Sequence, residues 1–432
     1  MTGRFLYASA DGRHRFRLRM RWLRQAQPAV QGKQEFVQDD NHGNLGMTTF
    51  TGGSKTASPP RDIRFLFRLS VITTVVLICG CRCREPARPV GRPVVGVKIY
   101  ETGGELPGLF KEWRSLGINT VFASVSLNRN PEFRKLARRN GIVRYAILPV
   151  FFDPEALRAD SSLFAVTAAG ENAREEWVEF VCPSREDFRR QKIESVKNLI
   201  RESDPDGLSI DFIRHFVFWE KVYPDRAVGS LPNTCFDRHC LRAFERDTGI
   251  RIPFGLKRTQ EISDWILKTH REEWTAWKCG LITGFVKDAA DEARRAKPSI
   301  LINLHAVPWR RGDFGNAIRF VAGQDFAELS KSCDFLSPMT YSHMLGREPA
   351  WVHSVVEDIA GQSACPVLPS IQVGKAYLES EITVEEFAEN LRQALRFPSK
   401  GAVFWNWDAL EKEPSKKNVI RNLLKKHETG IQ

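Results

Sequence analysis

The chain has 432 residues, of which 42% are hydrophobic and 27% are charged, so collagen-like, disordered and multi-span membrane classes are excluded. The net charge of +12 would favour nucleic-acid binding if it were spread along the chain. However, residues 1–92 hold 16 Lys/Arg against 6 Asp/Glu, and the remaining residues have a net charge of only +2. The main body therefore gives no reason to expect a nucleic-acid partner.

The first 60 residues contain the basic run RHRFRLRMRWLRQ and show neither helix caps nor a stable apolar period. We expect residues 1–60 to be a disordered extension or a wrongly assigned start, with translation beginning at or near Met47. The alternative is a basic arm that binds phosphate groups non-specifically. Export of the chain, for which the next segment argues, speaks against that alternative.

Residues 61–81 read RDIRFLFRLSVITTVVLICGC, in which three arginines precede an apolar run of ten residues. This run has about half of the ~20 residues of a membrane-spanning helix, which is typical of a signal peptide. Its end, Ile78-Cys79-Gly80-Cys81, resembles the bacterial lipoprotein signal with Cys81 as the lipidated residue, although Cys79 departs from the usual pattern. We expect an exported lipoprotein anchored to the bacterial cell membrane, with residues 82–93 as an Arg/Pro-rich tether; an uncleaved signal anchor is the alternative.

From residue 94 onward, β-branched apolar runs alternate with segments of helical period. The predicted strands are 94–100, 118–125, 142–152, 206–211, 300–304, 335–339, 367–372 and 402–405, with a closing helix over 416–426. Eight such repeats predict an α/β fold, a (β/α)8 TIM barrel over residues 94–430 with an insertion at about 216–265 after strand four. The first strand is not followed by G-x-G-x-x-G, so a dinucleotide-binding fold is not supported.

Helix starts can be read from capping residues. Asn130 before Pro131, Ser184 with Asp187, and Thr383 with Glu386 each predict the beginning of a helix.

Six cysteines lie in the barrel region after residue 93 and allow up to three disulfides in an exported domain. The short spacing makes a local bridge between Cys235 and Cys240 the favoured pairing. Cys235, His239 and Cys240 would also supply three zinc ligands, but no second cysteine pair stands at zinc-finger spacing. We therefore expect neither a metal nor another cofactor.

The run Asp206-Gly207-Leu208-Ser209-Ile210-Asp211-Phe212-Ile213-Arg214 resembles the strand-four signature of glycoside-hydrolase-like TIM barrels, the lipoprotein-associated group typified by glycosyl-hydrolase-like family ten. The segments 235–253 and 324–341 are similar to the insertion and the strand-six region of that group. A distant similarity to family 18 glycoside hydrolases breaks down, because Ile213 stands where their catalytic Glu would be. The resemblance implies a barrel that acts on carbohydrate.

Glycosidic cleavage ordinarily requires two carboxyl groups, and in a TIM barrel they lie at the carboxyl ends of the strands. Asp211 is the strongest candidate, because the alternation along strand four points its side chain into the barrel mouth. Its partner is left open among Glu101, Asp153 and Asp408. The candidate substrate-binding residues at these strand ends are Arg214, His215, His305, Tyr341, Gln372, Trp405, Asn406 and Trp407. Lys98, a charge inside strand one, needs a partner such as Asp211 or Glu101.

We thus expect a monomeric glycoside hydrolase that cleaves a poly- or oligosaccharide with two carboxylates, centred on Asp211. The alternative is a carbohydrate-binding barrel without catalysis, which would explain the missing family 18 acid.

Overall fold

The computed structural model describes residues 93–378 and 380–429. The predicted extension, the signal segment with its lipidated Cys81, and residues 82–92 of the tether lie outside these described residues. Among the described residues, no helix has the length and hydrophobicity that crossing a bilayer requires.

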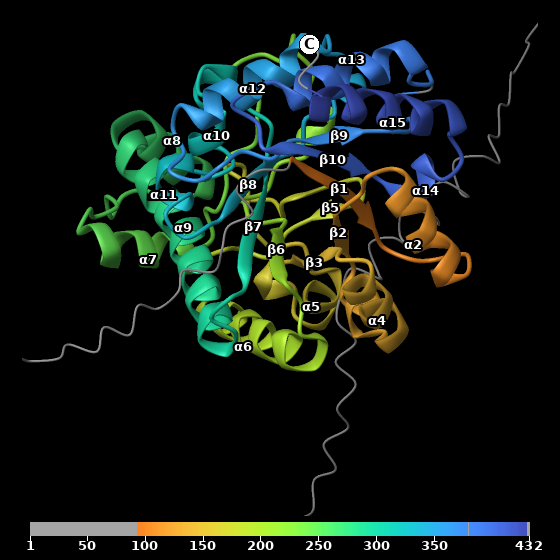
Figure 1. Cartoon of the computed structure of the whole chain (residues 1–432). Helices are drawn as coiled ribbons and strands as arrows, with labels where there is room; N and C mark the ends of the chain where they lie inside the picture. The colour runs from red at the N-terminus through yellow and green to blue at the C-terminus, as the bar shows by residue number, and fades with distance from the viewer. Residues whose placement is uncertain (1–92, 379, 430–432) are drawn as a thin grey trace, which may run out of the picture. The chain divides into compact units, whose positions relative to one another are not determined.

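Eight parallel strands form the centre of the fold, in the sheet order β8-β7-β6-β3-β2-β1-β10-β9 (Figure 1). They are β1 (Val94–Ile99), β2 (Thr120–Ala123), β3 (Val143–Pro149), β6 (Gly207–Asp211), β7 (Leu301–Ala306), β8 (Phe335–Pro338), β9 (Ser370–Gln372) and β10 (Gly401–Trp405). Parallel bridges from Leu336 to Val367 and from Met339 to Ser370 join the two outer strands and close the sheet on itself. The predicted (β/α)8 barrel is therefore confirmed, with all eight strands within a few residues of their expected positions.

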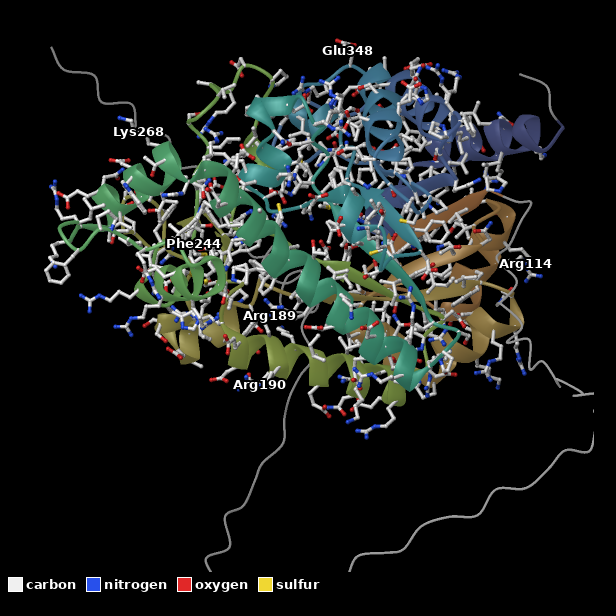
Figure 2. The ribbon with its side chains drawn as sticks, turned by 90° about the vertical axis from the view of Figure 1, so that its left-hand side faces the viewer. Arg114, Arg189, Arg190, Phe244, Lys268 and Glu348 are labelled. Atoms are coloured by element: carbon white, nitrogen blue, oxygen red, sulfur yellow. The ribbon has the colours of Figure 1, made fainter. Side chains whose placement is uncertain are left out.

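Helices lie between successive strands and surround the barrel, as Figure 1 shows. They are α2 (Leu106–Ser115), α3 (Val125–Arg129), α4 (Pro131–Arg139), α5 (Pro154–Ala159), α6 (Glu186–Ser203), α7 (Arg238–Thr248), α8 (Thr259–Thr269), α9 (Arg271–Ala296), α10 (Ala317–Phe320), α11 (Phe326–Leu329), α12 (Ala350–Ala360), α13 (Val384–Leu395), α14 (Trp407–Leu410) and α15 (Pro414–Thr429). Short 3-10 turns occupy Ser161–Leu163 (η1), Trp219–Lys221 (η2), Asp313–Gly315 (η3) and His343–Leu345 (η4), and β4 (Arg174–Glu175) pairs with β5 (Val178–Glu179) as a small hairpin. In Figure 2 the long helix α9 crosses the view, with α6 and its Arg189 and Arg190 along one side and Phe244 of α7 near its first turns.

All three predicted helices are present. Asn130 Oδ1 accepts the amide of Glu132 at 2.9 Å, and Thr383 Oγ1 accepts the amide of Glu386 at 3.1 Å. The capping role predicted for Ser184 is wrong: α6 begins one residue later, after Arg185, and the Ser184 hydroxyl faces two cysteine sulfurs instead. A local capping pattern is overridden there by contacts between distant segments.

The barrel interior is filled by side chains from its own strands rather than left as a pore. Phe122 and Tyr145 stack with ring centroids 4.7 Å apart and an interplanar angle of 17°. A Cβ atom on Gly207 would lie 2.3 Å from the Tyr145 ring, so only glycine leaves room for that ring. The glycine of the Asp206-Gly207 signature therefore has a packing role.

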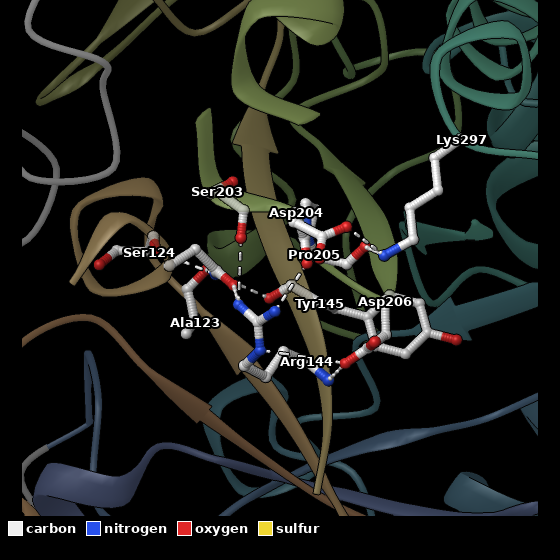
Figure 3. A network of polar contacts seen from close by, with 10 residues as sticks. Ala123, Ser124, Arg144, Tyr145, Ser203, Asp204, Pro205, Asp206 and Lys297 are labelled. Carbon is white, nitrogen blue, oxygen red and sulfur yellow. Dashed lines mark hydrogen bonds and ion pairs between the residues drawn. The ribbon is translucent and has the colours of Figure 1, made fainter. Parts of the chain in front are cut away.

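Arg144 at the start of β3 ties several chain segments together at the amino-terminal end of the barrel (Figure 3). Its guanidinium donates to Asn128 Oδ1 at 3.2 Å and to the carbonyl oxygens of Ser203 at 3.4 Å and Asp204 at 2.7 Å. Its amide donates to Asp206 Oδ2 at 2.9 Å, so the aspartate of the Asp206-Gly207 signature is structural as well. This end of the barrel lies opposite the strand ends that form TIM-barrel sites.

Candidate functional site

Asp211 is the last residue of β6, the fourth barrel strand, and its side chain is buried with 6% relative exposure. Its Oδ1 accepts the amide of the next residue, Phe212, at 2.7 Å. Phe212 has a φ of +49°, a left-handed conformation that is strained for an aromatic residue and that occurs most often at functional sites. The chain thus turns sharply where the strongest candidate carboxyl ends the strand.

The charge of Asp211 is set by burial and by two buried cations. Burial raises the pKa of Asp211 above its ordinary value of 3.8, and Lys98 and the Phe212 amide oppose the rise, followed by Arg214. Lys98, in β1, donates to the Tyr341 hydroxyl at 3.1 Å, and burial lowers its pKa to about 8 although Asp211 acts to raise it. The electrostatic partner expected for Lys98 is therefore Asp211.

A pocket of about 460 Å³ opens around Asp211 at the carboxyl ends of the strands. Its volume lies within the range of small-molecule sites. Of the residues predicted from the sequence, its walls include Asp211, Arg214, Tyr341, Trp405, Asn406 and Asp408. Tyr341 and Trp405 stack on each other with ring centroids 4.5 Å apart and an interplanar angle of 15°, which gives the pocket a flat aromatic wall.

Asp408 brings a second carboxyl group to the same pocket, from the first turn of α14 behind β10. Desolvation raises the pKa of Asp408; Lys412 acts to lower it, while Glu101 and Glu411 raise it. Glu101 itself is not part of the pocket wall. Of the two acids, Asp408 is the one placed to meet a bound ligand.

Asp153 and Trp407 have structural partners and lie outside the pocket wall. Asp153 caps α5 by accepting the amide of Ala156 at 3.0 Å, and it pairs with Lys192 at 2.8 Å. Trp407 is buried against Trp113 in an edge-to-face contact at 5.7 Å. Both side chains serve packing rather than the cavity.

Three further polar candidates are buried outside the pocket wall. His305 Nε2 bonds to Ser209 Oγ at 2.9 Å inside the barrel, and His215 Nε2 faces the carbonyl oxygen of Lys278 at 3.2 Å. Gln372 accepts the amide of Met344 at 3.0 Å and donates to the carbonyl oxygen of Gly374 at 2.9 Å, so it shapes loops beside the pocket. The seventh barrel strand, β9, therefore ends in an amide rather than an acid.

Several pocket residues come from segments that the sequence pattern did not identify, namely Trp177, Glu220, Lys375 and Tyr377. Trp177 lies between β4 and β5, and its indole nitrogen donates to the Tyr377 hydroxyl at 3.1 Å, 200 residues along the chain. Glu220 is buried in η2, and its charge helps to keep the buried Arg214 protonated. Glu220 is thus a third carboxyl in the pocket. The only sequence signal for this position is that Glu220 follows Asp211, the last residue of β6, by nine residues.

Away from this pocket wall, the sulfur atoms of Cys182, Cys235 and Cys240 lie within 4.8 Å of one another. All three are free thiols, so the bridge expected between Cys235 and Cys240 is not formed in the described part of the chain. His239, the other expected ligand, instead contacts the carbonyl oxygen of Ser184 at 3.1 Å. Among the described residues, these three sulfurs are the group arranged to hold a metal ion.

Comparison with known proteins gives no matching family model and no match among curated proteins. Solved structures share the fold. The glycoside hydrolase domain of PgaB (BpsB) from Bordetella bronchiseptica has a TM-score of 0.57 and 15% identity, covering 77% of this chain and 99% of that domain. A β-galactosidase from the psychrophilic Marinomonas ef1 has a TM-score of 0.57 and 11% identity, covering 78% of this chain and 61% of its own. The GH42 β-galactosidase Gan42B from G. stearothermophilus has a TM-score of 0.55 and 12% identity, covering 79% and 57%. This chain spans about three-fifths of each galactosidase, and identities this low establish the shared barrel fold alone.

Proposed function

We propose that the chain is a glycoside hydrolase that cleaves a poly- or oligosaccharide in the pocket around Asp211. The observation that carries the proposal is a buried carboxyl with a raised pKa, set between aromatic walls at the carboxyl ends of the barrel strands. Aromatic faces pack against the apolar faces of sugar rings, while charged and amide groups bind the hydroxyls. The solved structures with this fold include β-galactosidases and the PgaB glycoside hydrolase domain, which supports the same substrate class.

In this mechanism Asp211 donates the proton to the glycosidic oxygen, because a carboxyl with a raised pKa stays protonated at higher pH. The second carboxyl, which attacks the sugar or activates water, is Glu220 or Asp408. Glu220 lies beside the buried Arg214 cation, whose charge favours the ionised form that a nucleophile or base needs.

The proposal is tested by incubating the full chain with a panel of oligosaccharides and polysaccharides and measuring the reducing ends released. Release that is lost in a variant without the Asp211 carboxyl supports the proposal. Binding of a glycan without release would favour the second candidate, a carbohydrate-binding barrel without catalysis. The end of β9 carries the amide of Gln372 rather than a carboxyl, and this is the observation that favours that alternative.

Lys98→Met should move the alkaline limb of the pH profile of kcat/KM to higher pH. The Lys98 cation lowers the pKa of Asp211, so its removal lets that pKa rise and keeps Asp211 protonated further into the alkaline range. A shift of about one pH unit is expected for the loss of one nearby charge. Lys331→Met, on an exposed lysine paired with Glu328, is the matched control and should leave the limb in place. An unmoved or acid-shifted limb in Lys98→Met would mean that Asp211 is not the titrating acid.

Trp177→Ala should raise KM and leave kcat nearly unchanged. Its ring forms part of the pocket wall without carrying a reacting group, so its loss weakens ground-state and transition-state binding equally. An aromatic contact of about 1 kcal/mol corresponds to roughly a fivefold change in KM. Trp265→Ala, on a half-buried Trp of α8 outside the pocket wall, is the control in the same steady-state measurement. Equal KM values for the two variants would count against a sugar site at Trp177.

We also propose that the chain is exported and anchored to the bacterial cell membrane through a lipid on Cys81, and that it acts as a monomer. The support for export and anchoring is the sequence of residues 61–81. Cys81→Ala should abolish incorporation of labelled fatty acid and move the protein to the soluble fraction. Peptides from residues 1–46 in the mature protein, or fatty-acid labelling that survives Cys81→Ala, would contradict this proposal.

A further inference from the structure

Three cysteines from separate parts of the chain meet in a buried cluster between the barrel and the segment that follows β6. Cys182 precedes α6, Cys235 lies before α7, and Cys240 is in the first turn of α7. Each has at most 1% relative exposure. Cys182 and Cys240 have their sulfur atoms 3.0 Å apart, and all three sulfurs lie within 4.8 Å of one another.

The Ser184 hydroxyl completes this cluster. Its oxygen lies 3.1 Å from the Cys182 sulfur and 3.0 Å from the Cys240 sulfur. This is the serine that the sequence pattern assigns to the start of α6 and that the fold turns toward the sulfurs instead. The Ser184 oxygen is thus close to two of the three sulfurs.

Thiolates rather than thiols are the ligands of metal ions, and three cysteine sulfurs within 4.8 Å of one another would supply three such ligands.

Lys278 supplies one positive charge next to the cluster. It is fully buried in α9, and its ammonium donates to Asn233 Oδ1 at 3.0 Å and to the carbonyl oxygens of Phe320 at 3.1 Å and Val321 at 3.2 Å. The ammonium interacts electrostatically with Cys182, Cys235 and Cys240. Three thiolates with a divalent cation would leave one negative charge, which this ammonium would balance.

We propose that Cys182, Cys235 and Cys240 bind a structural zinc ion, with the Ser184 hydroxyl placed as the fourth ligand. Thiolate ligands select soft or borderline metals, and a closed tetrahedral site is typical of structural zinc. Zinc–sulfur bonds of about 2.3 Å place tetrahedral sulfurs about 3.8 Å apart, so the Cys182 and Cys240 sulfurs need to separate by less than 1 Å. The ion would join the loop before α6 to the start of α7 and hold the segment after β6 against the barrel.

The test is the metal content of the full chain, purified under reducing conditions without chelator or affinity metal. We expect about one zinc per chain by mass spectrometry, and cobalt in place of zinc should give the charge-transfer absorption of thiolate ligands. Cys182→Ser and Cys235→Ser should lower the zinc content at least tenfold, while Cys333→Ser, at a cysteine outside the cluster, should leave it unchanged.

The zinc content of the wild-type protein tests the proposal even if the cysteine variants do not fold. Zinc below about one-tenth per chain, together with no cobalt–thiolate absorption, would overturn the proposal. A disulfide between any two of these three cysteines in protein prepared without reductant, with no zinc bound after reduction, would overturn it as well. Unfolding of the wild-type chain at lower temperature after chelation would support it, because the binding free energy of a structural metal is also folding free energy.

Discussion

Asp211→Asn is expected to lower kcat by about 10² to 10⁴-fold, the range of a lost general acid. The amide is nearly isosteric with the carboxyl but cannot donate its proton to a glycosidic oxygen. Phe212 keeps an oxygen acceptor at 2.7 Å, so the turn after β6 should survive the substitution. Rates are measured as reducing ends released from the best glycan of the panel. Undiminished activity would remove Asp211 from the catalytic role.

Asp153→Asn is the matched control for this substitution. Asp153 is also an aspartate behind a barrel strand, but it caps α5 and pairs with Lys192 outside the pocket wall. Its kcat should therefore stay close to that of the wild type. A loss of activity equal to that of Asp211→Asn would show that the assay responds to general damage rather than to a lost proton donor.

The stability of Asp211→Asn distinguishes a functional aspartate from a structural one. Because the pKa of Asp211 is raised in the folded chain, the folded state binds this proton more tightly than the unfolded state does. Ionisation therefore costs stability, and the cost grows as pH rises from the ordinary pKa of 3.8 through the raised one. Near neutral pH the inactive variant should melt at a higher temperature than the wild type, with the difference vanishing in acid. A variant destabilised at neutral pH would indicate that Asp211 serves the fold.

Arg144→Met should have the largest effect on stability, lowering the free energy of unfolding by about 2–4 kcal/mol because buried acceptors lose their donor. Asn128 Oδ1 and the carbonyl oxygens of Ser203 and Asp204 would then lose their guanidinium donor. Figure 3 shows this guanidinium beside Ser203 and Asp204. The effect is measured as the change in the denaturant midpoint at constant slope. The pocket lies at the other end of the strands, so kcat of the folded fraction should change little.

Arg138→Met controls for the loss of an arginine as such. Arg138 is exposed near the end of α4, and its replacement should change stability by less than about 0.5 kcal/mol. Equal midpoints for the two variants would show that the Arg144 contacts contribute nothing to stability.

The site was only partly predictable from the sequence. Acids and aromatics at or just after strand ends, such as Asp211, Tyr341 and Trp405, could be placed because strand ends meet at one edge of a barrel. Trp177 and Glu220 could not, because they belong to loops with no periodic pattern and reach the pocket only through tertiary contacts. His215 and Gln372 were predicted to bind substrate, but they lie outside the pocket wall. Their position in the sequence does not show that their polar atoms are bonded to backbone groups.

The sequence alone determined the eight-strand alternation, and with it the barrel, because β-branched runs and helical periods are local properties that each segment carries by itself. It also located the excess positive charge in residues 1–92, leaving a nearly neutral barrel. Only the tertiary structure decided which carboxyls share a pocket and which cysteines meet. Cys182 and Cys240 lie 58 residues apart, and their sulfurs come within 3.0 Å because folding packs the segment after β6 onto the loop before α6. Such distances depend on how whole helices and strands pack against one another. This packing cannot be read from the order of residues along the chain.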